Sequence, residues 1–139
     1  MDNRGRLLDW SAVAEAASIE TEERFVRVVF SRAVDSVAAA LALQGRIDAA
    51  AQATRRVLLD YRCVGAHAEE VRESMWDWAA RADLEGIAVV VDGELTRVRL
   101  NMTALSRRVP MRAFLGLDEA AKWLVDPNPR RTTRITRIV

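Results

Sequence analysis

Short apolar runs bounded by polar residues recur along the chain and predict strands. Residues 25–30, 56–61 and 87–91 are rich in β-branched, aliphatic or aromatic side chains and do not alternate strictly between apolar and polar positions. Runs of this kind are typical of strands that are covered on both faces, as in parallel sheets. Residues 109–114 predict a further strand. We therefore expect a sheet of four or five strands.

The clearest helix is predicted over residues 67–83. Its apolar residues recur every three or four positions, which places them on one face of a helix. Glu69, Glu70 and Glu73 occupy the early turns, where the positive end of the helix dipole stabilises negative charge. The apolar stripe consists of Val71, Met75, Trp78, Ala79 and Ala82.

Two further helices are predicted on either side of this region. The alanine-rich segment 34–53 has apolar residues at roughly helical spacing, and Ser36 suits a helix start. Gly45 lies inside this segment and is a candidate break between two helical pieces. Residues 117–125 predict a short last helix that ends before the prolines following it.

Two segments allow two interpretations each. Residues 94–107 follow an Asp-Gly pair, which favours a hairpin, but their apolar residues also lie three, four and three positions apart, which favours a helix. We prefer the helix because helices and strands alternate elsewhere in the chain. The first 20 residues favour a loosely attached helix, although residues 11–21 also suit a short extended piece. The apolar residues of the former segment are Leu95, Val98, Met102 and Leu105.

The predicted order of strand and helix repeats along the whole chain. Such alternation is typical of a mostly parallel sheet joined by right-handed crossovers and covered by helices. The sequence therefore predicts an α/β fold, with a four- to five-stranded, mostly parallel or mixed sheet and about four to five helices in one domain.

Composition narrows the functional classes. The chain has 139 residues, which suits one domain, and its 21 basic and 20 acidic residues give a net charge of +1. This balance offers no general attraction to nucleic acid or anionic lipid. Cys63 is the only cysteine, so no internal disulfide forms, and no apolar run approaches the roughly 20 residues that span a bilayer. With no signal peptide apparent, we expect a cytoplasmic protein without membrane insertion.

Four segments, in their order and spacing, carry a resemblance to a known family. They are the strand RRVLLDY, the charged helix after it, the strand EGIAVVV and the unit MRAFLGLDEAAKWL. Together they resemble the SpoIIAA-like proteins, which have a STAS-type fold. The resemblance covers roughly residues 22–126 and leaves residues 1–21 as an N-terminal extension and residues 127–139 as a basic C-terminal tail. The positions that match the family's last strand and helix are Arg112, Phe114, Asp118, Glu119, Trp123 and Leu124.

The resemblance implies a domain that has no cofactor and acts in binding or regulation. Bacterial STAS domains act as anti-sigma-factor antagonists and are switched by phosphorylation of a serine at the start of the helix after the Leu-Leu-Asp strand. Here that helix start reads His-Ala-Glu-Glu and contains no serine or threonine, and Ser74 lies a turn further in. An anti-sigma-factor antagonist with an altered phosphosite is therefore the alternative interpretation of the function.

Few residues are suited to catalysis. His67 is the only histidine and lies four positions from Cys63, beside Glu69 and Glu70. A nucleophile needs a base within hydrogen-bonding reach and a third group that orients this base, whereas the sequence offers only proximity. No spacing of ligand-type residues suggests a metal site. We predict that the protein is not an enzyme and has neither a cofactor nor a metal.

Other residues are candidates for binding. Trp76 lies off the apolar stripe of its helix, so it either packs on a neighbouring element or lines a ligand cleft or a dimer contact. Tyr61 is the last residue of a predicted parallel strand, and ligands usually bind at the carboxyl ends of such strands. Residues 130–139 carry four arginines and no acid, which suits an acidic partner, an added edge strand or a disordered tail.

Together these features predict a non-enzymatic regulatory or binding domain. We expect it to engage a protein partner or a small apolar ligand and to form a homodimer, and we do not expect it to bind nucleic acid. The residues expected at the ligand or partner surface are Tyr61, Cys63, His67, Glu69, Glu70, Trp76, Arg130 and Arg131.

Overall fold

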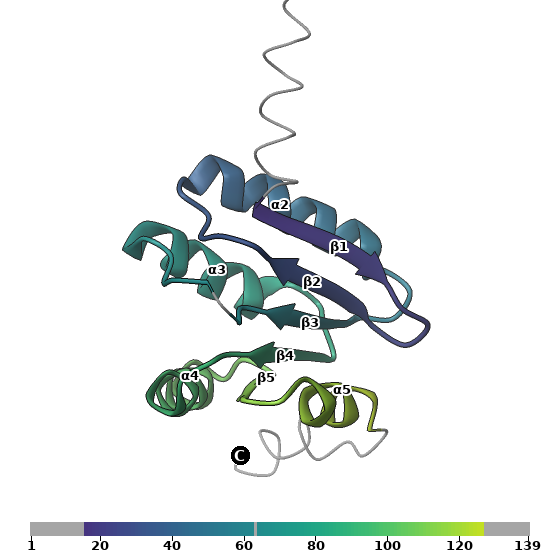
Figure 1. Cartoon of the computed structure of the whole chain (residues 1–139). Helices are drawn as coiled ribbons and strands as arrows, with labels where there is room; N and C mark the ends of the chain where they lie inside the picture. The colour runs from purple at the N-terminus through teal and green to yellow at the C-terminus, as the bar shows by residue number, and fades with distance from the viewer. Residues whose placement is uncertain (1–15, 63, 127–139) are drawn as a thin grey trace, which may run out of the picture.

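Five strands lie side by side in one sheet, in the same order as in the sequence (Figure 1). The computed structural model describes residues 16–62 and 64–126. The strands are β1 (Ala17–Thr21), β2 (Val26–Phe30), β3 (Arg56–Asp60), β4 (Gly86–Val90) and β5 (Met111–Phe114). β1 and β2 form an antiparallel hairpin, and every later strand pairs in parallel with the one before it. The predicted mixed, mostly parallel sheet is confirmed.

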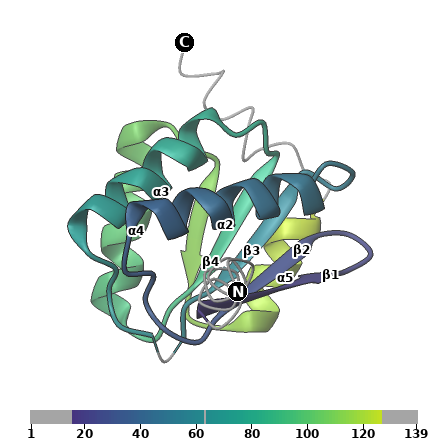
Figure 2. The same cartoon turned by 90° about the horizontal axis from the view of Figure 1, so that it is seen from above.

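Helices cover both faces of this sheet. Within the described residues they are α2 (Val37–Ala50), α3 (Glu69–Arg81), α4 (Glu94–Arg107) and α5 (Leu117–Val125). From β2 onward the strands advance across the sheet in one direction, so right-handed crossovers place all three connecting helices on the same face. α5 follows the last strand and packs on the opposite face, as the two views show (Figures 1 and 2). The α/β fold class is confirmed.

The core has two layers because side chains alternate across the pleated strands. In β3, Val57 and Leu59 face α2 and α3, whereas Leu58 faces α5 and packs with Ala120 and Leu124. All five residues of β4 are buried, as expected for a central strand covered on both faces. The prediction of strands covered on both faces is therefore correct for β3 and β4, whereas β2 alternates between buried and half-buried residues.

Both ambiguous segments have a definite structure where they are described. Residues 94–107 form helix α4, so the helix is confirmed and the hairpin is wrong. Gly93 precedes α4 with φ −109° and ψ 139°, which is extended backbone, whereas a two-residue type I′ hairpin turn needs positive φ. Residues 17–21 form β1, so for them the extended alternative is confirmed and the favoured helix is wrong. Residues 1–15 lie outside the described residues.

Helix α2 begins where the sequence predicts and continues past its predicted break. The Ser36 hydroxyl accepts a hydrogen bond from the Ala39 backbone N–H at 3.1 Å, which satisfies one free donor of the first turn. The helix then runs through Gly45 without interruption, so the predicted break is wrong. Two contacts tie α2 to α3. Trp78 Nε1 donates to Asp48 Oδ1 at 2.8 Å, and Gln44 Nε2 donates to Ser74 Oγ at 3.1 Å.

Asp60 is a buried carboxylate at the carboxyl end of the central strand β3. Its side chain is 2% exposed and accepts hydrogen bonds from the Arg62 guanidinium at 2.8 and 3.0 Å and from the Arg62 backbone N–H at 3.1 Å. Arg27, on β2, lies 3.6 Å away. Burial by itself would raise the pKa of Asp60, but the Arg62 hydrogen bonds and the charges of both arginines together lower it. The carboxylate is therefore held ionised inside the fold.

We predict that Asp60→Asn lowers the free energy of unfolding by about 1–3 kcal/mol, because two arginines lose the charge that they surround. Chemical denaturation followed by circular dichroism measures the change. Asp83→Asn is the matched control, since Asp83 is 93% exposed and pairs with Arg55 at the surface. The control should change stability by less than about 0.5 kcal/mol. Equal effects of the two substitutions would show that the buried Asp60 carboxylate contributes no more to the free energy of unfolding than a surface carboxylate does.

Candidate functional site

Three aromatic rings meet where the parallel strands end. The Phe30 ring, at the end of β2, stacks on Tyr61 with 4.2 Å between the ring centroids and 12° between the planes. His67, in the loop before α3, packs edge-on against both rings, with centroid distances of 5.6 and 5.2 Å. The carboxyl edge of the sheet thus brings together Tyr61 and His67, two of the residues that the sequence analysis selected.

Both ring nitrogens of His67 are engaged. The Val34 backbone N–H donates to Nδ1 at 3.0 Å, so Nδ1 acts as an acceptor and carries no proton. In the neutral ring Nε2 then carries the proton, and it lies 3.2 Å from the Tyr61 hydroxyl oxygen. Burial, together with the nearby charge of Arg72, lowers the pKa of His67. These contacts give His67 a structural role that joins the loops after β2 and β3; Cys63 lies outside the described residues.

A small apolar cavity lies behind these rings, between the sheet and α3. Its volume is about 80 Å³. Ligand pockets for drug-sized molecules commonly measure about 300–1,000 Å³, so this cavity accommodates only a much smaller group. Burial raises the pKa of the Tyr61 hydroxyl well above its usual range, which keeps it protonated. The lining residues are Leu59, Tyr61, His67, Arg72, Met75, Trp76, Trp78, Val89 and Met111.

Trp76 faces this cavity on one side and α4 on the other. The ring is half-buried and packs against the main core, and the Arg107 guanidinium lies 5.5 Å from its centroid. Arg107 also donates to both carboxylate oxygens of Glu73 at 3.0 Å. Trp76 therefore both packs on a neighbouring element and lines a cavity, the two roles that the sequence analysis considered. Arg107 joins α4 to α3.

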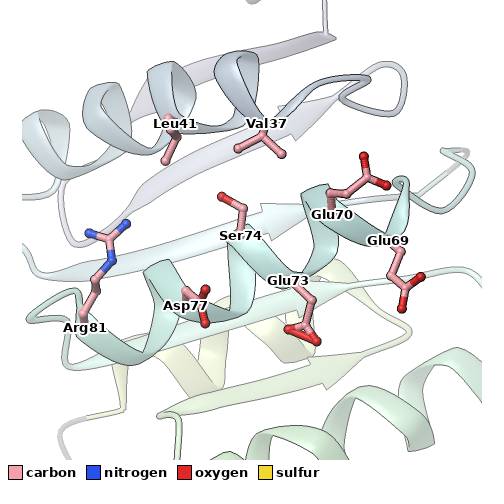
Figure 3. Close-up of a pocket in the computed structure, with 8 residues that line it drawn as sticks. All are labelled: Val37, Leu41, Glu69, Glu70, Glu73, Ser74, Asp77 and Arg81. Atoms are coloured by element: carbon pink, nitrogen blue, oxygen red, sulfur yellow. The ribbon is translucent and has the colours of Figure 1, made fainter.

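A much larger, open groove of about 590 Å³ runs along the outer surfaces of α2 and α3 (Figure 3). We call it the acidic groove. Four carboxylates and one guanidinium line it from α3, and the exposed apolar side chains of Val37 and Leu41 line it from α2 (Figure 3). Such a surface is complementary to a ligand that combines positive charge with apolar groups. The lining residues are Val37, Leu41, Glu69, Glu70, Glu73, Ser74, Asp77 and Arg81.

Glu69 and Glu70 lie at one end of the acidic groove, in the first turn of α3 (Figure 3). They are the acidic residues of its first turn, and Ala68 caps the helix without a side-chain hydrogen bond. Ser74 lines the groove one turn further along, and its hydroxyl accepts the Gln44 hydrogen bond already described. The start of α3 is thus a patch of negative charge without a phosphorylatable hydroxyl.

The sequence-selected residues do not form one site. Tyr61, His67 and Trp76 line the small cavity, whereas Glu69 and Glu70 line the acidic groove. Arg130 and Arg131, like Cys63, lie outside the described residues. Sequence reasoning missed the contribution of α2, because the exposure of Val37 and Leu41 depends on which face of α2 meets the sheet.

Two findings on the described residues concern metal binding and membrane-spanning helices. In residues 16–62 and 64–126 no group of three or more histidine, cysteine, aspartate or glutamate side chains is arranged to hold a metal ion. Within the same residues no helix is both long and apolar enough to cross a membrane.

Comparison with known proteins identifies the fold. No protein-family model and no curated protein matches the chain. Among solved structures, an uncharacterised protein of the DUF3478 family with a SpoIIAA-like fold, from Shewanella loihica, is 12% identical with a TM-score of 0.61 and covers 78% of this chain and 92% of its own. An anti-sigma factor antagonist from Mycobacterium paratuberculosis is 23% identical with a TM-score of 0.59 and covers 79% of this chain and 93% of its own. The chain therefore has a SpoIIAA-like fold of the STAS type.

We predict that acid destabilises the protein through His67. Because the folded state favours the neutral ring, the folded pKa lies below the unfolded value of about 6.5. The stability that depends on a neutral His67 ring is fully present above pH 6.5 and is lost as the pH falls through the lowered pKa. Urea denaturation at pH 7.0 and 5.5 measures the loss. The variant His67→Asn has no titrating group at this position, so its stability should be nearly insensitive over the same interval; an unchanged pH dependence in it would contradict the assignment.

Proposed function

We propose that the protein is a non-enzymatic regulatory domain that binds a partner protein through the acidic groove. The groove carries the proposal because it combines four carboxylates with two exposed apolar side chains on two adjacent helices. Protein interfaces combine apolar contacts with charged groups, and the acidic groove offers apolar side chains on α2 beside carboxylates on α3. The expected partner therefore presents a basic surface that also contains apolar residues.

The solved structures support a regulatory role. One of the two similar structures is described as an anti-sigma factor antagonist, a protein that acts on another protein. Its similarity supports a role in partner binding for this chain and leaves the identity of the partner to experiment.

The start of α3 distinguishes this chain from an antagonist that is switched by phosphorylation there. Glu69 and Glu70 place permanent negative charge where a phosphate would place it conditionally. If the protein is an anti-sigma-factor antagonist, its binding is then constitutive at this position. This version of the function rests on the two acids, whereas the general proposal rests on the whole groove.

A small apolar ligand is the weaker alternative. The cavity beside Trp76 measures about 80 Å³, and His67 and Tyr61 use their polar atoms on each other and on Val34. A partner surface on α2 and α3 therefore agrees better with the space and the polar groups that the fold leaves accessible.

The test is capture from a lysate of the native host, followed by binding measurements with the purified partner. The double variant Glu70→Arg, Asp77→Arg reverses two charges of the acidic groove at exposed positions. We expect this variant to raise the dissociation constant for the partner at least about tenfold in isothermal titration calorimetry, because its new arginines face the basic surface of the partner. We also expect wild-type binding to weaken as the salt concentration rises.

The matched control is the double variant Asp118→Arg, Glu119→Arg in the first turn of α5, on the opposite face of the sheet. It makes the same change of net charge and should leave the affinity unchanged. Equal affinities of the groove variant and the wild type would reject the acidic groove as the partner site. Thermal melts of both variants establish that they are folded.

A further inference from the structure

Helix α4 exposes a continuous apolar stripe. Four large apolar side chains on it are exposed: Leu95 (62%), Val98 (38%), Met102 (66%) and Leu105 (69%). These are the residues whose spacing predicted the helix. Single exposed apolar residues are ordinary, but four on one stripe of one helix mark an interaction surface.

The stripe remains exposed after α4 has packed on its own sheet. The packed side of the helix consists of Ala104, which is buried, and Leu100, which contacts the main core. Asn101 secures this side, because its amide accepts the Ala113 N–H of β5 at 2.7 Å and donates to the Ala113 carbonyl at 3.3 Å. The domain thus fixes α4 without using the stripe.

The spacing of the stripe indicates what covers it. Positions that are three, four and three residues apart correspond to the a and d positions of a heptad, which form the seam between two packed helices. In this register Glu94 occupies a g position and Arg99 an e position, where charges set the choice and direction of the partner helix. The occupant that fits is therefore a helix with apolar a and d residues and complementary flanking charges.

We propose that α4 of a second copy of this chain covers the stripe, so that the protein dimerises through an α4–α4 contact. The helix has both properties that its partner needs. The 3-4-3 spacing reads the same in both directions, so apolar residues meet apolar residues in either orientation. In a parallel pair the Glu94 carboxylate, which also binds Arg97 of its own chain, meets Arg99 of the second copy. A two-fold axis makes this contact occur twice.

A lipid surface fits these charges less well. Residues 94–108 contain four arginines, but Arg97 is paired with Glu94, and Arg107 is paired with Glu73 on α3. Two of the four charges are therefore neutralised within the chain. Membrane-surface helices instead carry a strongly basic polar face.

Analytical ultracentrifugation of the full chain over a range of micromolar concentrations tests the proposal. We expect a concentration-dependent species of twice the monomer mass, because a seam of four residues is small compared with a standard interface. Met102→Glu combined with Leu105→Glu should raise the dissociation constant at least about tenfold. Since both side chains are mostly exposed in the monomer, the melting temperature of this variant under monomeric conditions should stay close to that of the wild type.

Leu115→Glu is the matched control for the single variant Leu105→Glu, because each places one negative charge on an exposed leucine and Leu115 lies outside α4. It should leave the dimer intact. Arg99→Glu should weaken a parallel dimer, in which Arg99 meets Glu94, and should leave an antiparallel dimer intact, so this variant reports the direction. A wild-type protein that stays monomeric throughout overturns the proposal, and so does a dimer that survives the double α4 substitution. Stripe-dependent binding of the monomer to phosphatidylserine vesicles would assign the stripe to a lipid surface instead.

Discussion

The handedness of the strand–helix–strand crossover is the constraint on which the architecture depends. Because the strands from β2 to β5 advance across the sheet in one direction, right-handed crossovers place α2, α3 and α4 on the same face of the sheet. The opposite face then depends on α5, whose residues Ala120 and Leu124 are fully buried against β3 and β4. The handedness rule thus explains the layer formed by α2, α3 and α4, whereas α5 follows the last strand and covers the opposite face with its own apolar residues.

The same arrangement explains why the accessible surfaces are so different. α2 and α3 lie next to each other, and their outward-facing side chains create the acidic groove. α3 and α4 are joined by Arg107, which pairs with Glu73 and lies over Trp76. This arginine neutralises one carboxylate of the groove and fixes the helix that carries the apolar stripe. The proposed partner surface and the proposed dimer surface are therefore neighbours that share a structural contact.

The carboxyl edge of the sheet shows how a residue that looks catalytic can be structural. His67 is the only histidine of the chain and lies four positions from Cys63, a proximity that by itself was too little to predict a nucleophile and its base. In the fold its Nδ1 accepts from the Val34 backbone, and Nε2 faces Tyr61. A buried neutral imidazole that bridges two loops needs no chemistry to explain it. Non-local contacts of this kind are not visible as a spacing in the sequence.

The sequence by itself determined the fold class and the elements from β2 to α5, because buried parallel strands and amphipathic helices leave local patterns of apolar residues. It identified β4 as a strand covered on both faces from such a pattern, and it favoured α4 as a helix from apolar spacing together with the alternation of helices and strands. Only the tertiary structure decided which face of each helix is covered, since that depends on crossover handedness and on distant contacts such as Asn101 with Ala113. For this reason the apolar spacing from Leu95 to Leu105 was correct about the helix yet gave no sign that the stripe stays exposed. The local spacing of apolar residues specifies that one face of a helix is apolar, and the tertiary structure decides whether that face packs on the sheet or stays exposed.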